Sequence, residues 1–225
     1  FQDSEPPSGL EQCGDRQLVA LRTDLEKLAQ ADPELPADEI QKAAAAIDSY
    51  AAAYQEEFGQ QHDHFNLIGQ DNFRRYLPVR EIRIRIHPDD TCFDIIARVC
   101  AAKIAGCRIT VSSPLSATPK VVEVLDRLTQ SWAGSIEFIE ESDDAMADVI
   151  RLRHTDRIRY AAPDRVPNSI REAVIGNYIH IADTPVLMQG RLELMWYVCE
   201  QSVCDDYHRY GNLGARTEEE RMEPK

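Results

Sequence analysis

The stretch EIRIRIHPDDTCFDIIARVCAAKIAG, residues 81–106, decides the fold. It begins with isoleucine and arginine in alternation from Ile82 to Ile86, the two-residue period that predicts a β-strand. The polar run 88–91 then supplies residues that start helices, and Gly106 supplies one that ends them. Between these points apolar side chains recur at steps of three and four, as on one helical face: Phe93, Ile96, Val99, Cys100 and Ile104. A strand leading directly into a helix is the first half of a βαβ unit.

The chain after Gly106 repeats this unit. The same patterns predict helices that begin after Pro119, after Ser142 and near Pro167, and further strands over residues 107–112, 135–140, 157–160 and 178–181. Strict alternation with short connections predicts the α/β class, with a Rossmann-like, doubly wound, mainly parallel sheet within residues 79–200. One more helix is predicted from Gly190, with one apolar face: Leu192, Met195, Val198 and Cys199.

Four other segments flank this domain. Residues 1–16 are polar, contain proline and glycine and lack an apolar period, so we interpret them as a disordered linker. Residues 17–58 carry two apolar stripes at helical spacing, which predicts a helical hairpin. Residues 59–78 are too irregular for either period and are interpreted as an extended connection, and residues 201–225 as a C-terminal tail. The sequence leaves open whether the hairpin packs on the α/β domain or on another domain.

Composition limits the possible partners. The chain has 39 acidic against 25 basic residues, and a net charge of -14 repels nucleic acid and anionic lipid. No apolar run approaches the ~20 residues that cross a bilayer. The 6 cysteines form no CxxC pair, so reduced thiols are expected. We therefore expect a cytoplasmic protein that neither binds nucleic acid nor inserts into a membrane.

The helix start after the first strand argues against a dinucleotide site. Such a site needs a glycine-rich turn, so that backbone amides approach the diphosphate. The sequence has His87-Pro88-Asp89-Asp90-Thr91 instead, where the proline lacks an amide proton and two carboxylates oppose a diphosphate. A GxxxxGK[ST] loop and a GxSxG elbow are also missing from the sequence.

Three other groups of residues are candidates for sites. His62 and His64, with Asp63 and a more distant His87, could be metal ligands, but a polar loop is favoured because no third ligand is located. Core packing is favoured over nucleophilic roles for Cys100 and Cys107. A solvated face or interdomain ion pairs are favoured over anion binding for five arginines: Arg74, Arg75, Arg80, Arg83 and Arg85. The sequence thus predicts no catalytic, cofactor-binding or metal-binding residue.

Three segments carry a resemblance to a known family: IGQDNFRRYLP at 68–78, YAAPDRVP at 160–167 and HRYGNLG at 208–214. With them, residues 50–216 resemble the extreme C-terminal region of bacterial proline-utilisation dehydrogenases, in the aldehyde dehydrogenase superfamily. The resemblance implies a parent protein that oxidises proline with FAD and then L-glutamate γ-semialdehyde (pyrroline-5-carboxylate) with NAD, and channels the intermediate. Both reactions would belong to domains outside this chain.

The resemblance carries over no catalytic residue. Aldehyde dehydrogenases have a nucleophile in a Gly-Gln-x-Cys setting, whereas this chain reads Gly-Gln-Asp-Asn at 69–72. The resemblance implies a non-catalytic C-terminal domain whose tail helps to seal the substrate tunnel against the catalytic domains of the parent chain or a partner subunit. The candidate tail contacts are Tyr207, Tyr210 and Asn212.

Two other functions stay open. The fold could be a regulatory module that senses an amino acid or an anion, or it could retain a nucleotide or small-acid site at the carboxyl edge of its sheet. The tail itself could also be a strand or turn that only completes the sheet.

Overall fold

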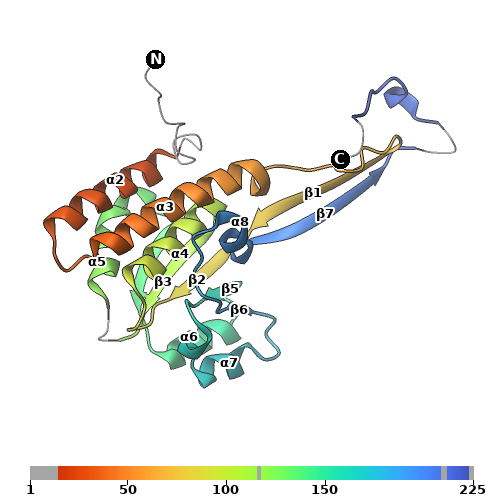
Figure 1. The fold of residues 1–225 in the computed structure, drawn as a ribbon. Coiled ribbons are helices and arrows are strands. Elements are labelled where there is room, and N and C mark those ends of the chain that lie inside the picture. The colour runs from red at the N-terminus through yellow and green to blue at the C-terminus, as the bar shows by residue number, and fades with distance from the viewer. Residues whose placement is uncertain (1–14, 116–117, 209–211, 223–225) are drawn as a thin grey trace, which may run out of the picture.

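A five-stranded parallel sheet forms the centre of the protein. The computed structural model describes residues 15–115, 118–208 and 212–222. The strands lie in the order β4-β3-β2-β5-β6, and every neighbouring pair is parallel. Their bounds are β2 Glu81–Arg85, β3 Arg108–Ser113, β4 Ile136–Glu140, β5 Arg157–Arg159 and β6 His180–Ala182. The predicted α/β, Rossmann-like class is therefore confirmed (Figure 1).

Helices cover both faces of this sheet, as a doubly wound fold requires. The first, α4, spans Cys92–Ala105; Thr91 and Asp94 form a capping box at its start, and Gly106 ends it with a φ of 85°. The helix α5, Lys120–Leu128, packs beside α4, whereas α6, Asp143–Arg151, and α7, Asn168–Val174, lie together on the opposite face (Figure 1). Each face has its own buried apolar cluster. The 3-10 turns are Gln130–Trp132, Pro163–Arg165, Leu194–Trp196 and Gly214–Arg216.

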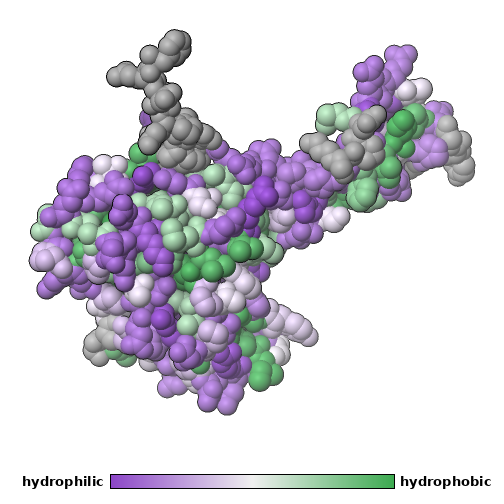
Figure 2. All heavy atoms as spheres, viewed as in Figure 1, coloured by the Kyte–Doolittle hydropathy of each residue, from purple (hydrophilic) through white to green (hydrophobic). Residues whose placement is uncertain are grey.

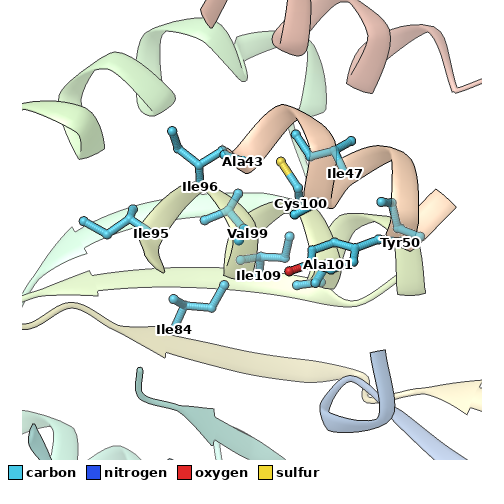
Figure 3. Close-up of a cluster of buried hydrophobic side chains, with 14 of the residues drawn as sticks. Ala43, Ile47, Tyr50, Ile84, Ile95, Ile96, Val99, Cys100, Ala101 and Ile109 are labelled. Atoms are coloured by element: carbon cyan, nitrogen blue, oxygen red, sulfur yellow. The ribbon is translucent and has the colours of Figure 1, made fainter. Parts of the chain in front are cut away.

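The predicted helical hairpin forms and packs on the α/β domain. Its helices are α2, Arg16–Ala31, and α3, Ala37–Ala53, and α3 continues into a π-helical turn at Tyr54–Phe58. The helix α3 packs directly against α4, and their side chains belong to one buried cluster that reaches the sheet (Figure 3). The packing of the hairpin, which the sequence left open, is therefore on this domain. No described helix is both long and apolar enough to cross a membrane.

The arginines of β2 contradict the expectation of a solvated face or interdomain pairing. Ile82 and Ile84 face α4, whereas Arg83 and Arg85 point to the opposite face, where they are only 7% and 4% exposed. Arg83 pairs with Glu141 at 2.5 Å and Arg85 with Asp143 at 2.8 Å. The reason is the place of β2 at the centre of a parallel sheet, because such a strand is covered on both faces.

A long two-stranded ribbon projects from the body (Figure 1). Strand β1, Gln70–Pro78, pairs antiparallel with β7, Val198–Asp206, over all nine residues. We call this ribbon the arm; at ~3.3 Å per residue it is about 30 Å long. Its root is at the Pro78–Val198 pair and its tip at the Gln70–Asp206 pair. The arm thus takes residues 70–78 of the predicted connection and residues 201–206 of the predicted tail.

The arm also explains why the predicted helix from Gly190 is shorter than expected. The helix α8 spans only Gly190–Glu193, a 3-10 turn follows, and β7 then begins. The prediction that Val198 and Cys199 lie on the helix is therefore wrong. Pairing with β1 supplies these residues with backbone hydrogen bonds that their own sequence did not indicate.

Candidate functional site

The place to look for a ligand in this fold is the point where the strand order reverses. In open α/β sheets, ligands bind outside the carboxyl ends of the strands on either side of that point. Here it lies between β2 and β5, because the chain moves outward to β4 on one side and to β6 on the other. The helix α4 begins directly above it.

The side chain of Arg98 fills this point. It extends from α4 and is completely buried. Its Nη1 donates to the carbonyl oxygen of Arg85 at 2.9 Å and to that of Arg159 at 3.2 Å, so it bridges the ends of β2 and β5. Its Nε donates to the carbonyl oxygen of Asp94 at 2.8 Å, and its Nη2 donates to the Asp90 carboxylate.

Asp90 places a negative charge at the start of α4. Its side chain is 0% exposed. Besides Arg98, it accepts hydrogen bonds from Nη1 of Arg165 at 2.6 Å and from the amide of His87 at 3.0 Å. Arg165 also donates to Asp94 at 3.1 Å. Asp90 directly precedes the cap residue Thr91, so its carboxylate adds negative charge beside the position where a helix start would attract an anion.

A dinucleotide does not fit this arrangement. Its diphosphate would need free amides at the start of α4, but those of Phe93 and Asp94 already donate to the Glu39 carboxylate at 3.2 Å and to Thr91 Oγ1 at 3.1 Å. A diphosphate would also meet the Asp90 carboxylate and repel it. We therefore assign no NAD-binding role to any of the described residues.

A cavity of about 320 Å³ opens beside this ion network. Arg85, on one wall, donates to Ser112 Oγ at 2.8 Å and to Asp143 at 2.8 Å. Tyr160, on another wall, is 2% exposed, and burial raises the pKa of its hydroxyl. The full lining is Arg85, Ile86, His87, Pro88, Pro114, Asp143, Tyr160, Asp164, Arg165, Val166 and Pro167.

A second buried ion pair fixes the root of the arm. Arg159 on β5 and Glu193 on α8 are both 0% exposed, and their side chains meet at 2.9 Å. Glu193 also accepts from the Tyr197 hydroxyl at 2.9 Å and from the Leu187 amide at 3.0 Å. This cluster joins the last turn before β7 to the sheet. Neither this cluster nor the role of Arg98 was predicted from the sequence. The only indication of a buried charge was a charged residue within an otherwise apolar stretch.

The tail folds back on the tip of the arm. Asp71, on β1, accepts hydrogen bonds from Arg216 at 2.8 Å and 3.1 Å and also from Arg221. These two guanidinium groups lower the pKa of the Asp71 carboxyl to about 2. The ring of Tyr207 lies 3.8 Å from the Arg216 guanidinium, and its hydroxyl accepts from the Gly69 amide at 2.8 Å.

The three predicted tail contacts have different outcomes. Tyr207 is engaged within the chain, by Gly69 and the two arginines. Asn212 is exposed, and its side chain accepts from the Gly214 amide at 2.8 Å, as in a local turn. Tyr210 lies outside the described residues. Contact of any of them with a catalytic domain stays a prediction.

The three candidate histidines do not come together in one site, because His87 lies apart from His62 and His64. His62 and His64 stack with ring centroids 5.4 Å apart, and His62 contacts the Glu57 carbonyl oxygen at 3.0 Å. Asp63 accepts instead from backbone amides, including that of Asn66. His87 lines the cavity at the sheet edge. No group of three or more potential metal ligands occurs among the described residues.

The two cysteines considered as nucleophiles are core residues. Cys100 is 0% and Cys107 3% exposed. Burial raises the pKa of both thiols, that of Cys107 to about 12. Cys107 donates to the Tyr197 carbonyl oxygen at 3.3 Å. Neither thiol is a thiolate at neutral pH, so neither is an activated nucleophile.

The other three arginines considered as an anion site form pairs around the arm. Arg74 pairs with Glu57 at 2.7 Å, Arg75 donates to Gln201 at 2.7 Å, and exposed Arg80 lies 3.7 Å from Asp156. They do not converge on one anion site.

Comparison with known proteins gives similarity at the level of structure. No known protein family and no curated protein matches the sequence. Among solved structures, Proline Utilization A from Corynebacterium freiburgense matches 94% of this chain at 20% identity, with a TM-score of 0.50. Proline Utilization A from Bradyrhizobium japonicum matches 79% at 19% identity and a TM-score of 0.60. An aldehyde dehydrogenase from Bartonella henselae matches 80% at 15% identity and a TM-score of 0.59.

The match covers only part of each of those proteins. It takes in 16% and 20% of the two Proline Utilization A chains and 40% of the aldehyde dehydrogenase chain. At such low identity the likeness is one of fold. The chain therefore has a fold that proline utilization proteins and aldehyde dehydrogenases contain as one part of a larger structure, in agreement with the resemblance of its sequence.

Proposed function

We propose that this chain is a non-catalytic C-terminal module of a larger enzyme that oxidises proline to glutamate. In this proposal the arm and its tail dock on the catalytic domains, of the same chain or of a partner subunit, and help to close the passage for the γ-semialdehyde. FAD and NAD would bind to those other domains. The observation that carries the proposal is the arm.

The arm has features of an element that is completed by a partner. A two-stranded ribbon is marginally stable alone in water, and sheet edges offer backbone groups for further pairing. On the outer edge of β1 the backbone of Arg74 already pairs with that of His62. Large apolar side chains gather along it and near its tip, and Figure 2 shows hydrophobic residues near the free end. The exposed ones are Phe65, Leu67, Ile68, Leu77, Val203 and Met222.

The ion network at the start of α4 supports the non-catalytic part of the proposal. A fold that has lost its cofactor can close the vacant crevice with its own side chains, and Arg98 and Asp90 do so at this sheet edge. The proposal therefore assigns assembly to the fold and leaves the chemistry to the other domains.

The test compares the intact parent enzyme with a version truncated after Asp206. This end point keeps β7 whole, whereas truncation before Gln201 would remove most of the pairing partner of β1. Semialdehyde-dependent NADH formation and proline-coupled flux are followed together. We expect coupled flux to fall more than direct semialdehyde oxidation, because an unsealed passage loses its intermediate to solvent. If both rates are unchanged, the sealing role is wrong.

A surface variant tests docking by the arm separately. Ile68→Asp places a charge on a side chain that is 69% exposed near the tip, and Ile175→Asp does the same on the body, at 77% exposed. We expect only Ile68→Asp to alter assembly of the parent enzyme, measured by light scattering after size-exclusion chromatography. Equal behaviour of the two variants would contradict docking by the arm.

A further inference from the structure

The cavity beside the point where the strand order reverses is lined by charged groups of both signs that can form further hydrogen bonds. Arg85 and Arg165 line it together with Asp143 and Asp164. A cavity with two cations and two anions does not favour a phosphate or a simple amine. It is complementary to a small molecule that carries both a carboxylate and an ammonium group.

Arg165 supplies the first unused donors. In the described part of the chain only its Nη1 donates hydrogen bonds, to Asp90 and Asp94. These two contacts fix the plane of the guanidinium and leave Nε and Nη2 for a carboxylate. His87 adds a donor, because its Nδ1 accepts from the Asp89 amide at 3.2 Å, so that the neutral ring carries its proton on Nε2.

Asp143 and Tyr160 supply the opposite wall. Oδ1 of Asp143 accepts from Arg85 at 2.8 Å, and its side chain is 44% exposed, so the second oxygen stays open. The nearest hydrogen-bond partner found for the Tyr160 hydroxyl is the sulfur of Met146 at 4.0 Å, a weak acceptor. A buried hydroxyl with so poor a partner gains from a ligand that bonds it.

The rest of the wall is apolar and rigid. Pro88, Pro114 and Pro167 stand around the cavity with Ile86 and Val166. Proline fixes its own φ, so these walls lose little freedom when a ligand enters. Their size and polarity suit a short aliphatic side chain, and about 320 Å³ is at the lower end of small-molecule sites.

We propose that this cavity binds a free α-amino acid with a small aliphatic side chain. The carboxylate lies toward Arg165 and His87, and the ammonium group lies toward Asp143 and Tyr160. The site is independent of the docking role of the arm, because it lies at the carboxyl edge of the sheet and shares no residue with the ribbon.

The test uses L-valine and its two halves as probes. Isovalerate (3-methylbutanoate) keeps the carboxylate without the ammonium group, and isobutylamine keeps the amine without the carboxylate. Binding to the isotopically labelled 225-residue chain is followed by the NMR shifts of the His87 and Val166 amides. We expect L-valine to shift both signals saturably, with each half-ligand binding at least tenfold more weakly. Inorganic phosphate and NAD are not expected to shift them.

Two conservative variants locate the site. Tyr160→Phe removes one hydroxyl and Asp143→Asn one charge, and both are expected to weaken L-valine binding at least threefold. Arg80→Gln, on an exposed residue outside the cavity, is the matched control and is expected to bind normally. The spectrum of each variant reports whether it is folded. The proposal is overturned if L-valine causes no saturable shift, if a half-ligand or phosphate binds as well, or if both folded variants bind normally.

Discussion

Replacing Asp90 by asparagine tests whether the network at the switch point stabilises the fold. The change keeps the size of the side chain and removes its charge, so Arg98, which is 0% exposed, becomes a buried cation without its counter-ion. Two unit charges ~4 Å apart at an effective dielectric of about 20 attract by ~4 kcal/mol. Breaking a buried pair by removing one partner costs about 3–5 kcal/mol, because the other charge stays buried.

This cost is measurable as a fall in the midpoint of thermal unfolding. For domains of this size about 1 kcal/mol lowers the midpoint by roughly 2–4 °C, so Asp90→Asn is expected to lower it by about 6–20 °C. Circular dichroism follows the transition. The matched control is Asp89→Asn, one residue earlier, whose side chain is 81% exposed and lies 3.5 Å from Nδ1 of His87. It is expected to change stability by less than about 0.5 kcal/mol.

A stabilising role of the Asp90 network is refuted if Asp90→Asn unfolds within about 1 °C of the unchanged chain. It is also refuted if Asp89→Asn is destabilised equally, since the effect would then come from charge near the helix start in general. A double-mutant cycle with Arg165→Gln separates the second arginine, and its contact with Asp90 at 2.6 Å should give a non-additive result.

Three further changes test other parts of the structure. Gly190→Ala should destabilise the chain by about 1–3 kcal/mol, because the added Cβ would lie 2.3 Å from the Ser49 carbonyl oxygen where α8 crosses α3; an unchanged thermal midpoint would contradict this close approach. In a Cys13→Ser background, a thiol reagent at neutral pH should label exposed Cys199 and Cys204 rapidly, but Cys100 and Cys107 only after denaturation, since burial raises the pKa of both, that of Cys107 to about 12. Rapid labelling of all four in the folded chain would be inconsistent with this core. The Asp71 carboxyl has a folded pKa of about 2 against an ordinary 3.8, so its pairing with Arg216 and Arg221 should hold the tail fully above about pH 4 and be lost as the pH falls toward 2. Amide exchange of residues 212–222 measures this, and Asp71→Asn should show rapid exchange at every pH; protection in that variant equal to the unchanged chain would count against it.

The α/β sheet could be predicted because its signals are local. The alternating isoleucines of β2, the Thr91 cap and Gly106 all act within a few residues of the element they define. The same holds for the two helices of the hairpin. Their packing on α4 could not be predicted, because an apolar stripe shows that a helix has a partner without showing which one.

The arm and the ion networks depend on contacts distant in sequence. Strand β7 has no apolar alternation of its own and forms because β1, near the other end of the domain, pairs with it. Arg83 and Arg85 alternate with apolar residues, a pattern typical of a strand with one solvated face, yet helices cover both faces of β2. Arg98 stands among apolar residues in α4, and only the three-dimensional fold places Asp90 and two strand ends around it.

The pairing of Gln70 with Asp206 at the tip of the arm determines how the protein responds to mechanical load. A pull on the C-terminal tail first loads the contacts of Arg216 and Arg221 with Asp71. Once these are lost it strains the pair of Gln70 and Asp206 and then each pair behind it, so the ribbon opens one pair at a time. Bonds loaded in series give way at a much lower force than bonds that share the load. The ribbon therefore yields before the parallel sheet, and tension on the tail is released at the arm before it reaches the core beneath α4.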